Sequence, residues 1–323
     1  MQSSSAPASV PVIVILGTGG TIAGTAASAG DNVGYTAAQR GVEQLVAAVP
    51  QLAATPIETE QVAQLDSKDM GYAVWLRLAQ RVAFHLARHE VGGIVITHGT
   101  DTLEETAWFL QRVLGPAKPV VLTGAMRPAT SLHSDGPQNV ADAVAVARAP
   151  GARGVVVAFA GAVHGARDVR KVHPYRVDAF GSGDAGPIAR IEEGALRGLR
   201  EWPRAGGELG VAGLPDDASA WPWVEIVTSG VQADGAAVRA LVAAGVRGLV
   251  VATTGNGTMR TELESALRAA QQQGVAVLRA TRCLDGRIVG GASADDPAAL
   301  PSAADLTPVK ARIELMLSLL EAA

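Results

Sequence analysis

The stretch Ile15–Gly24, which reads ILGTGGTIAG, begins as an apolar strand-like run and ends in a small, flexible turn that carries hydroxyl groups. A second stretch, Ile96–Thr106, reads ITHGTDTLEET and has the same organisation. In parallel α/β sheets, ligands bind just beyond the carboxyl ends of the strands. Glycine lets backbone N–H groups approach a substrate closely, and threonine supplies a nucleophile or a hydroxyl ligand. The two stretches together predict covalent amide chemistry with threonine as the nucleophile.

Strand and helix signals alternate along the chain, which predicts mostly parallel sheets flanked by helices, the α/β class. A helix is expected after Thr102, which forms a possible capping box with Glu105, and another from about Gln138 to Arg148. The strands of the first part are short β-branched runs of the fully buried kind. They are Val10–Leu16, Gly93–Thr97, Pro119–Thr123 and Gly154–Phe159.

A length of 323 residues suggests two domains. Prolines, glycines and other helix or strand breakers gather between Gly194 and Pro222. We therefore expect a larger N-terminal catalytic α/β domain over residues 1–196, a linker over 197–222 and a smaller C-terminal α/β domain over 223–323. In the latter, strands are expected at Val224–Thr228, Leu249–Thr253 and Val275–Ala280, and helices near Ala236–Ala244, Glu262–Gln272 and Pro308–Leu320.

The composition excludes several classes of protein. Hydrophobic residues make up 48% and charged residues 18%, which predicts a large folded core. The net charge of −4, without a basic stripe, argues against a nucleic-acid partner, and no window approaches a membrane span. The single cysteine, Cys283, excludes an intrachain disulfide and is expected to be a buried, inert thiol. Residues 1–9 have no basic n-region, so we expect a cytoplasmic protein.

Neither a metal nor a cofactor is expected. His85, His89 and Glu90 lie near one another without the spacing of a zinc-binding helix. A Gly-x-Ser-x-Gly nucleophile elbow is also missing. The turn Gly17–Thr21 lacks the lysine-serine ending of a phosphate-binding loop, and a purely structural role is an equal alternative for it. The small residues of Thr25–Gly34, closed by Tyr35, predict a mobile lid.

The other motifs also have structural alternatives when they are considered singly. In the stretch His98–Thr102, Asp101 or Thr102 would then cap a helix, Thr100 would be a turn residue and His98 a packed histidine at a strand end. The charged run Arg167–Lys171 would be a solvated loop, although a lysine in a cleft can activate a hydroxyl group. Asp66–Met70 would be a helix start, and Gly255–Gly257 a tight turn.

Taken in order, these pieces resemble the bacterial-type L-asparaginase family, which includes the glutaminase-asparaginases. The resemblance extends over nearly the whole chain. It is carried by TGGTIAG at Thr18–Gly24, DSKDM at Asp66–Met70, ITHGTDT at Ile96–Thr102, GAMRP at Gly124–Pro128, SDGP at Ser134–Pro137, DVRK at Asp168–Lys171 and GNG at Gly255–Gly257.

The resemblance implies a role for each matching residue. Thr21 would be the nucleophile that forms a β-aspartyl acyl-enzyme, with Tyr35 bonded to it. Thr100, Asp101 and Lys171 would form a second set that activates the attacking group. Substrate binding would involve Gly20 and Thr100 through an oxyanion hole, Ser67 and Asp101 at the α-carboxylate and α-amino groups, Ala125 at the side-chain amide, and Asn256 from a partner subunit. A homotetramer built from close dimers, acting on a small amino-acid amide, is implied.

This chain departs from the family pattern at two places. Lys68 stands where well-studied secreted members have glutamine, and it would repel a substrate ammonium unless it turned outward or paired with a carboxylate. The segment 283–294, where a partner-chain glutamate is expected, contains Asp285 but no glutamate. The implied activity is hydrolysis of L-asparagine to L-aspartate and ammonia. The alternatives are a broader glutaminase-asparaginase, the amidase subunit of a tRNA-dependent amidotransferase, and a non-catalytic α/β module that binds an anion.

Overall fold

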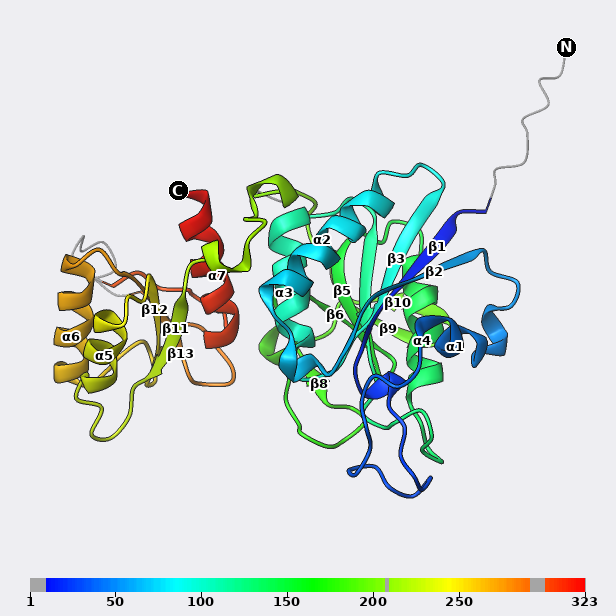
Figure 1. Cartoon of the computed structure of the whole chain (residues 1–323), viewed down its shortest axis with the longest axis horizontal. Helices are drawn as coiled ribbons and strands as arrows, with labels where there is room; N and C mark the ends of the chain where they lie inside the picture. Colours follow the sequence, from blue (N-terminus) through cyan, green and yellow to red (C-terminus); the bar gives the residue numbers. More distant parts are fainter. Residues whose placement is uncertain (1–9, 207–208, 291–299, 323) are drawn as a thin grey trace, which may run out of the picture. The chain divides into compact units, whose positions relative to one another are not determined.

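The computed structural model describes residues 10–206, 209–290 and 300–322. The chain forms two compact units, each a β-sheet flanked by helices (Figure 1). The first unit extends to Val211, and the second comprises the residues that follow together with the short piece Gly183–Ala185. Residues 1–9, whose lack of a basic region led us to expect a cytoplasmic protein, lie outside the described residues.

The first unit is built on an eight-stranded sheet with the order β10-β9-β6-β5-β4-β3-β1-β2. Strands β2, β1, β3, β4 and β5 pair in parallel, and β6, β9 and β10 extend the sheet in antiparallel fashion. Two further short strands, β7 and β8, form a separate pair. The bounds are β1 Val12–Gly19, β2 Ile57–Leu65, β3 Val91–Thr97, β4 Pro119–Thr123, β5 Gly154–Phe159, β6 Ala162–Gly165, β7 Arg170–Lys171, β8 Phe180–Gly181, β9 Ala189–Glu192 and β10 Ala195–Gly198.

The parallel strands of this sheet are covered by helices on both faces (Figure 1). Helices α2 (Tyr72–Leu86) and α3 (Leu103–Leu114) pack together on one face, and α1 (Val42–Ala47) and α4 (Gly136–Ala147) on the other. Successive side chains of a strand point to opposite faces, so a strand covered on both sides must be apolar throughout. Every residue of β4 and β5 is indeed buried. The α/β class and the central strands were therefore correctly predicted.

The second unit contains a parallel sheet with the order β11-β12-β13. Its strands are β11 Val224–Thr228, β12 Gly248–Thr253 and β13 Ala276–Thr281. Helices α5 (Ala236–Ala243) and α6 (Thr261–Gln272) pack on each other, and α7 (Pro308–Glu321) contacts all three strands. These elements lie within two residues of the predicted ranges. Cys283 is exposed, contrary to the expectation of a buried thiol, because the chain has left the sheet after β13.

Three features of the first unit were not foreseen. Strand β2 is half-buried and mixes charged and amide side chains with apolar ones, since it lies at an edge of the sheet. Helix α2 had not been placed, although its buried side chains follow a helical period. The antiparallel strands β9 and β10 were also missed, and the predicted linker, 197–222, begins within β10.

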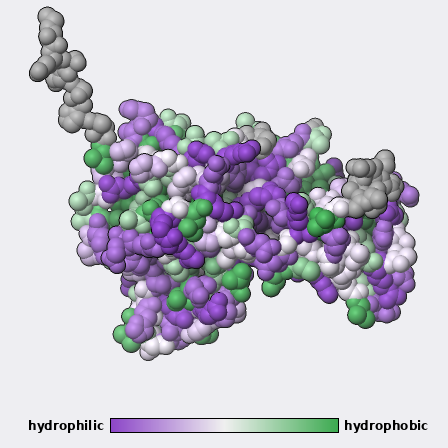
Figure 2. All heavy atoms as spheres, turned by 180° about the vertical axis from the view of Figure 1, so that it is seen from behind, coloured by the Kyte–Doolittle hydropathy of each residue, from purple (hydrophilic) through white to green (hydrophobic). Residues whose placement is uncertain are grey.

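The surface seen in Figure 2 is mixed in character, with hydrophobic residues dispersed among hydrophilic ones. Single exposed apolar residues are normal on a folded protein in water. Within the described ranges, no helix combines the length and the hydropathy that crossing a membrane requires.

Candidate active site

The two glycine-threonine turns meet at the carboxyl edge of the large sheet. Strands β1 and β3 are neighbours, with Gly17 opposite Thr97, so the turns that follow them lie side by side. Gly20 has a φ of 83°, and a Cβ atom there would collide with the backbone of Gly99. A Cβ atom on Gly99 would in turn collide with Ser67. Glycine at these two positions therefore allows three segments to converge on one point.

Thr21 follows this contact and begins a short 3₁₀ helix, Thr21–Ala23. Its side chain is almost fully buried, and its Oγ1 lies 2.7 Å from the hydroxyl oxygen of Tyr35. Tyr35 is brought there by a pair of backbone hydrogen bonds between Thr25 and Thr36, each 2.9 Å long. The residue predicted to close the lid and the predicted nucleophile are thus in direct contact.

Thr100, Asp101 and Lys171 form a second cluster. Lys171 lies on β7 with its side chain 17% exposed, and its Nζ donates hydrogen bonds to Thr100 Oγ1 at 2.9 Å and to Asp101 Oδ1 at 2.6 Å. The side chain of Asp101 is half-exposed, whereas Thr100 is buried. An ammonium group beside a hydroxyl group favours the deprotonated hydroxyl, and the carboxylate fixes the ammonium. The contacts of Lys171 therefore differ from those of the solvated loop that the run Arg167–Lys171 suggested by itself.

Ser67 holds the start of α3 beside this cluster. The backbone N–H of Asp101 donates to Ser67 Oγ at 3.3 Å, and Thr102 Oγ1 donates to the Ser67 carbonyl at 2.8 Å. The predicted capping box of Thr102 and Glu105 is therefore wrong: Thr102 is the N-cap residue, but its side chain makes no capping hydrogen bond. Its hydroxyl is instead used to join α3 to the segment that follows β2.

Lys68, the residue next to Ser67, is held by two carboxylates. Its Nζ lies 2.7 Å from Asp69 Oδ2 and 3.2 Å from Asp66 Oδ2, and the side chain is 61% exposed. The hydrogen bonds to Asp69 and then Asp66 raise the pKa of Lys68. Both arrangements considered from the sequence are observed, because the side chain is exposed and also pairs with carboxylates. Because it is exposed, the pairing contributes little to stability.

His98 is a fully buried positioning residue for the turn. Its Nδ1 lies 2.7 Å from the Gly99 carbonyl, and its Nε2 lies 3.0 Å from Thr106 Oγ1, which accepts a hydrogen bond from Trp75 Nε1. A carbonyl can only accept, so Nδ1 carries the proton and Nε2 accepts from Thr106. Burial lowers the pKa of His98 to about 4. The histidine is therefore neutral near pH 7, in the packed role considered for it.

Asp135 organises the neighbouring turn, a role that was not foreseen. Its carboxylate accepts hydrogen bonds from the backbone N–H groups of Met126 and Arg127 and from Asn139 Nδ2. Burial raises the pKa of this carboxyl group. The fully buried Ala125 immediately precedes the two N–H groups. An aspartate before Gly-Pro suggests a helix cap, but this one makes no capping hydrogen bond and reaches back along the chain instead.

Asn256 belongs to the second unit, where its side-chain amide is already bonded. Its Nδ2 donates to the Val289 carbonyl at 3.0 Å, and its Oδ1 accepts from the Val289 N–H at 2.6 Å. These bonds stabilise the turn between β12 and α6. Part of the segment in which a glutamate was expected, residues 291–294, lies outside the described residues.

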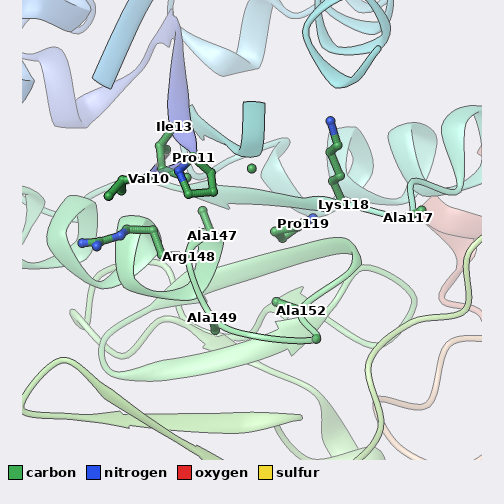
Figure 3. Close-up of a pocket in the computed structure, with 12 residues that line it drawn as sticks. Val10, Pro11, Ile13, Ala117, Lys118, Pro119, Ala147, Arg148, Ala149 and Ala152 are labelled. Carbon is green, nitrogen blue, oxygen red and sulfur yellow. The ribbon is translucent and has the colours of Figure 1, made fainter. Parts of the chain in front are cut away.

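A cavity of about 330 Å³ lies at the opposite, amino-terminal edge of the large sheet (Figure 3). Its charged lining residues are Lys118 and Arg148, and Figure 3 shows both side chains extending away from the labelled apolar residues. Lys118 Nζ donates hydrogen bonds to the carbonyl of Leu86, the last residue of α2, and to the carbonyl of Arg88 just beyond it. The hydroxyl groups of Thr21 and Thr100 and the Lys171–Asp101 pair lie away from this cavity, at the carboxyl edge of the sheet. Within the described ranges, no group of three or more His, Cys, Asp or Glu residues is arranged to hold a metal.

The fold and this site define the class of the protein, a two-domain α/β amidohydrolase. Residues 12–204 match the family described as asparaginase, N-terminal, and residues 223–322 match the glutaminase/asparaginase C-terminal domain. The chain belongs to the asparaginase family.

Relatives match the chain over almost its full length. It is 39% identical to L-asparaginase 2 of Escherichia coli strain K12, over 99% of this chain and 92% of that protein. It is also 39% identical to a glutaminase-asparaginase of Pseudomonas fluorescens biotype A, over 95% of this chain and 86% of the relative. The crystal structure of a probable cytoplasmic L-asparaginase from Campylobacter jejuni has a TM-score of 0.88 and 39% identity, covering 96% of this chain and 95% of the other.

Proposed function

We propose that this protein hydrolyses L-asparagine to L-aspartate and ammonia through an acyl-enzyme on Thr21. The observation that carries the proposal is the pair of threonine hydroxyls at one edge of the sheet, Thr21 on Tyr35 and Thr100 on the Lys171–Asp101 pair. Threonine is a poor nucleophile on its own and needs an adjacent base or cation. The membership of the asparaginase family supports the choice of amide.

In the first step, Thr21 Oγ1 attacks the carbonyl carbon of the substrate side-chain amide. The C–N bond breaks, the proton of the hydroxyl passes to the leaving nitrogen and ammonia departs, which leaves a β-aspartyl ester on Thr21. In the second step, water adds to the ester carbonyl and gives its proton to Thr100 Oγ1, while the Thr100 hydroxyl passes its own proton on to the Thr21 oxygen. The ester C–O bond breaks, which restores the Thr21 hydroxyl and releases aspartate. Lys171 stabilises the negative charge that develops on Thr100 Oγ1 during this transfer.

A backbone N–H group stabilises the negative charge that develops on the substrate oxygen. The N–H group of Thr100 is the proposed oxyanion donor. The resemblance also implies the N–H of Gly20 for this role, but in this structure that N–H donates to the Leu65 carbonyl at 2.9 Å. Losing one such donor typically costs on the order of a hundredfold in rate. Ala125 is proposed to contact the substrate amide, and Ser67 and Asp101 to hold the α-carboxylate and α-amino groups.

Release of ammonia from purified protein tests the activity. L-asparagine should be the preferred substrate and L-glutamine a weaker one, because one extra methylene usually changes the barrier by only about 1–3 kcal/mol. D-asparagine serves as the control for recognition of the α-carbon. Equal kcat/KM values for asparagine and glutamine would favour the second candidate, the broader glutaminase-asparaginase activity for which the Pseudomonas relative is named. Ammonia release from neither amide would refute both.

We also propose a homotetramer of close dimers in the cytoplasm, with Asn256 completing the site of its partner subunit. Thr21→Val and Asn256→Ala proteins, each impaired, would be mixed, dissociated and reassembled. Half of the dimers would be mixed and each would regain one of two sites, so about a quarter of the wild-type activity should return. If mixing restores nothing, Asn256 acts within its own chain.

A further inference from the structure

The lid, residues 25–36, rests along its length on a second segment, Ala129–Leu132, which we name the lid seat. Two contacts involve only the backbone. The N–H of Ala129 donates to the Gly24 carbonyl at 2.9 Å, and the N–H of Leu132 donates to the Ala29 carbonyl at 3.2 Å. The seat therefore follows the chain from Gly24, the residue before the lid, to Ala29 within the lid.

Two further contacts depend on side chains of the seat. The N–H of Ala26 donates to Thr130 Oγ1 at 2.9 Å. Ser131 Oγ donates to Asn32 Oδ1 at 2.7 Å. Both contacts join residues about a hundred positions apart in the chain, so they do not arise from the local conformation of either segment. They are the contacts through which a substitution in the seat can act on the lid.

The seat is itself anchored to the body of the first unit. Asp135 binds the backbone N–H groups of Met126 and Arg127 on one side of the seat and Asn139 of α4 on the other. The lid, in contrast, is joined at its base by the backbone pair of Thr25 and Thr36 and internally by Asp31, whose Oδ1 accepts from the N–H groups of Val33 and Gly34. The lid is thus a preformed loop resting on a fixed support.

From this arrangement we infer that Thr130 and Ser131 are positioning residues of the enzyme: they hold the lid on its seat so that the hydroxyl of Tyr35 reaches Thr21. This inference rests on the proposed function, in which Thr21 is the nucleophile. Neither side chain is assigned to the substrate or to the reacting atoms. They raise the fraction of protein molecules in which the lid is closed. Because substrate binds to the closed form, this fraction sets the apparent affinity for the substrate.

The test compares Thr130→Val, which has nearly the same shape but lacks the accepting oxygen, with Thr130→Ser, which keeps it. Loss of one such hydrogen bond should raise KM for asparagine about three- to tenfold and leave kcat within about twofold. Thr130→Ser should restore KM. Ser131→Ala should resemble Thr130→Val. Ser28→Ala is the matched control. Ser28 Oγ accepts a hydrogen bond from the N–H of Gly30, which also belongs to the lid, so this contact does not join the lid to the seat.

Amide hydrogen exchange of residues 25–36, measured without substrate, gives a second readout that does not depend on the activity. Exchange should be faster in Thr130→Val and Ser131→Ala than in wild type and Ser28→Ala. A lowered kcat with unchanged KM would show a structural defect and overturn the inference, as would unchanged exchange. Faster exchange with unchanged KM would show that the seat holds the lid without serving the reaction. If wild-type protein releases no ammonia, the proposed function fails, and exchange alone decides whether the seat holds the lid.

Discussion

The two threonine hydroxyls of the site are held in different ways. Thr21 contacts the phenol hydroxyl of Tyr35, which is 14 residues away and lies at the end of the lid. Thr100 contacts the ammonium of Lys171, which is 71 residues away on β7 and also pairs with Asp101. The first partner can leave when the lid opens. The second lies on a strand that is paired with β8, and its ammonium is also held by Asp101.

This difference suggests a division of roles. A fixed charge is most effective where it need not reorganise during the reaction, and the Lys171–Asp101 pair meets that condition. A partner on a lid can admit the substrate and then exclude water around it. We therefore expect substitutions at the Thr100 cluster to change kcat, and substitutions in the lid to change both KM and kcat.

The largest effect is expected when either hydroxyl is removed. Thr21→Val is nearly isosteric, so the fold should persist while turnover falls by about 10³-fold or more. Thr100→Val should be comparably severe because it breaks the second set. Thermal unfolding of both variants controls for folding. A Thr21→Val protein that stays within about tenfold of the wild-type kcat would remove Thr21 from the mechanism.

The next effect separates charge from hydrogen bonding. Lys171→Met keeps the length of the side chain and removes the ammonium, so kcat should fall about 10²- to 10³-fold. Lys118→Met is the control, since Lys118 Nζ binds two carbonyls near the end of α2 and should affect stability alone. If the two variants have similar kcat values, the fixed charge is not needed and the contrast between the two clusters fails.

A smaller effect is expected at the base of the lid. A Cβ atom on Gly24 would press against the ring of Tyr35, so Gly24→Ala should displace the phenol and lower kcat/KM about 10- to 100-fold. Gly30→Ala lies in the same lid, where the added Cβ atom would meet Ser28 Oγ at 3.9 Å, an ordinary van der Waals contact, and should have little effect. Equal activity of the two alanine variants would show that the position of Tyr35 is unimportant.

The last prediction concerns stability and not catalysis. Burial lowers the pKa of His98 from 6.5 to about 4, so between these pH values the unfolded chain binds a proton that the folded chain does not. This contribution to stability is fully present above about pH 6.5 and is lost as the pH falls toward 4. From pH 6.5 to 4, wild type should lose up to about 3 kcal/mol more of its free energy of unfolding than His98→Asn. Denaturant unfolding at several pH values measures this, and parallel curves would contradict it.

The sequence predicted those parts of the molecule that depend on local pattern. Buried β-branched runs identify β3 and β4 because both faces of these strands are covered. The edge strand β2 escaped notice, since half-exposed positions admit charged residues such as Glu58 and Glu60. The capping box failed for a similar reason: a threonine hydroxyl has several acceptors to choose from, and only the fold brings the Ser67 carbonyl within reach of Thr102.

The same distinction applies to the site. The glycine-threonine turns are short and contiguous, so the sequence could indicate both of them. The contacts of Thr130 and Ser131 with the lid join positions about a hundred residues apart, and no local pattern marks them. Asp135 carried a signal, an aspartate before Gly-Pro, but its target lies upstream in the chain instead of in the helix that it precedes.

The central claim, that Thr21 becomes acylated, is tested most directly by trapping the intermediate. Enzyme mixed with L-asparagine would be quenched in acid within the first turnovers, digested and analysed by mass spectrometry. Our account predicts an added aspartyl group on the peptide that contains Thr21, and no such adduct in the Thr21→Val protein. An adduct on the peptide that contains Thr100, with Thr21 unmodified, would contradict it.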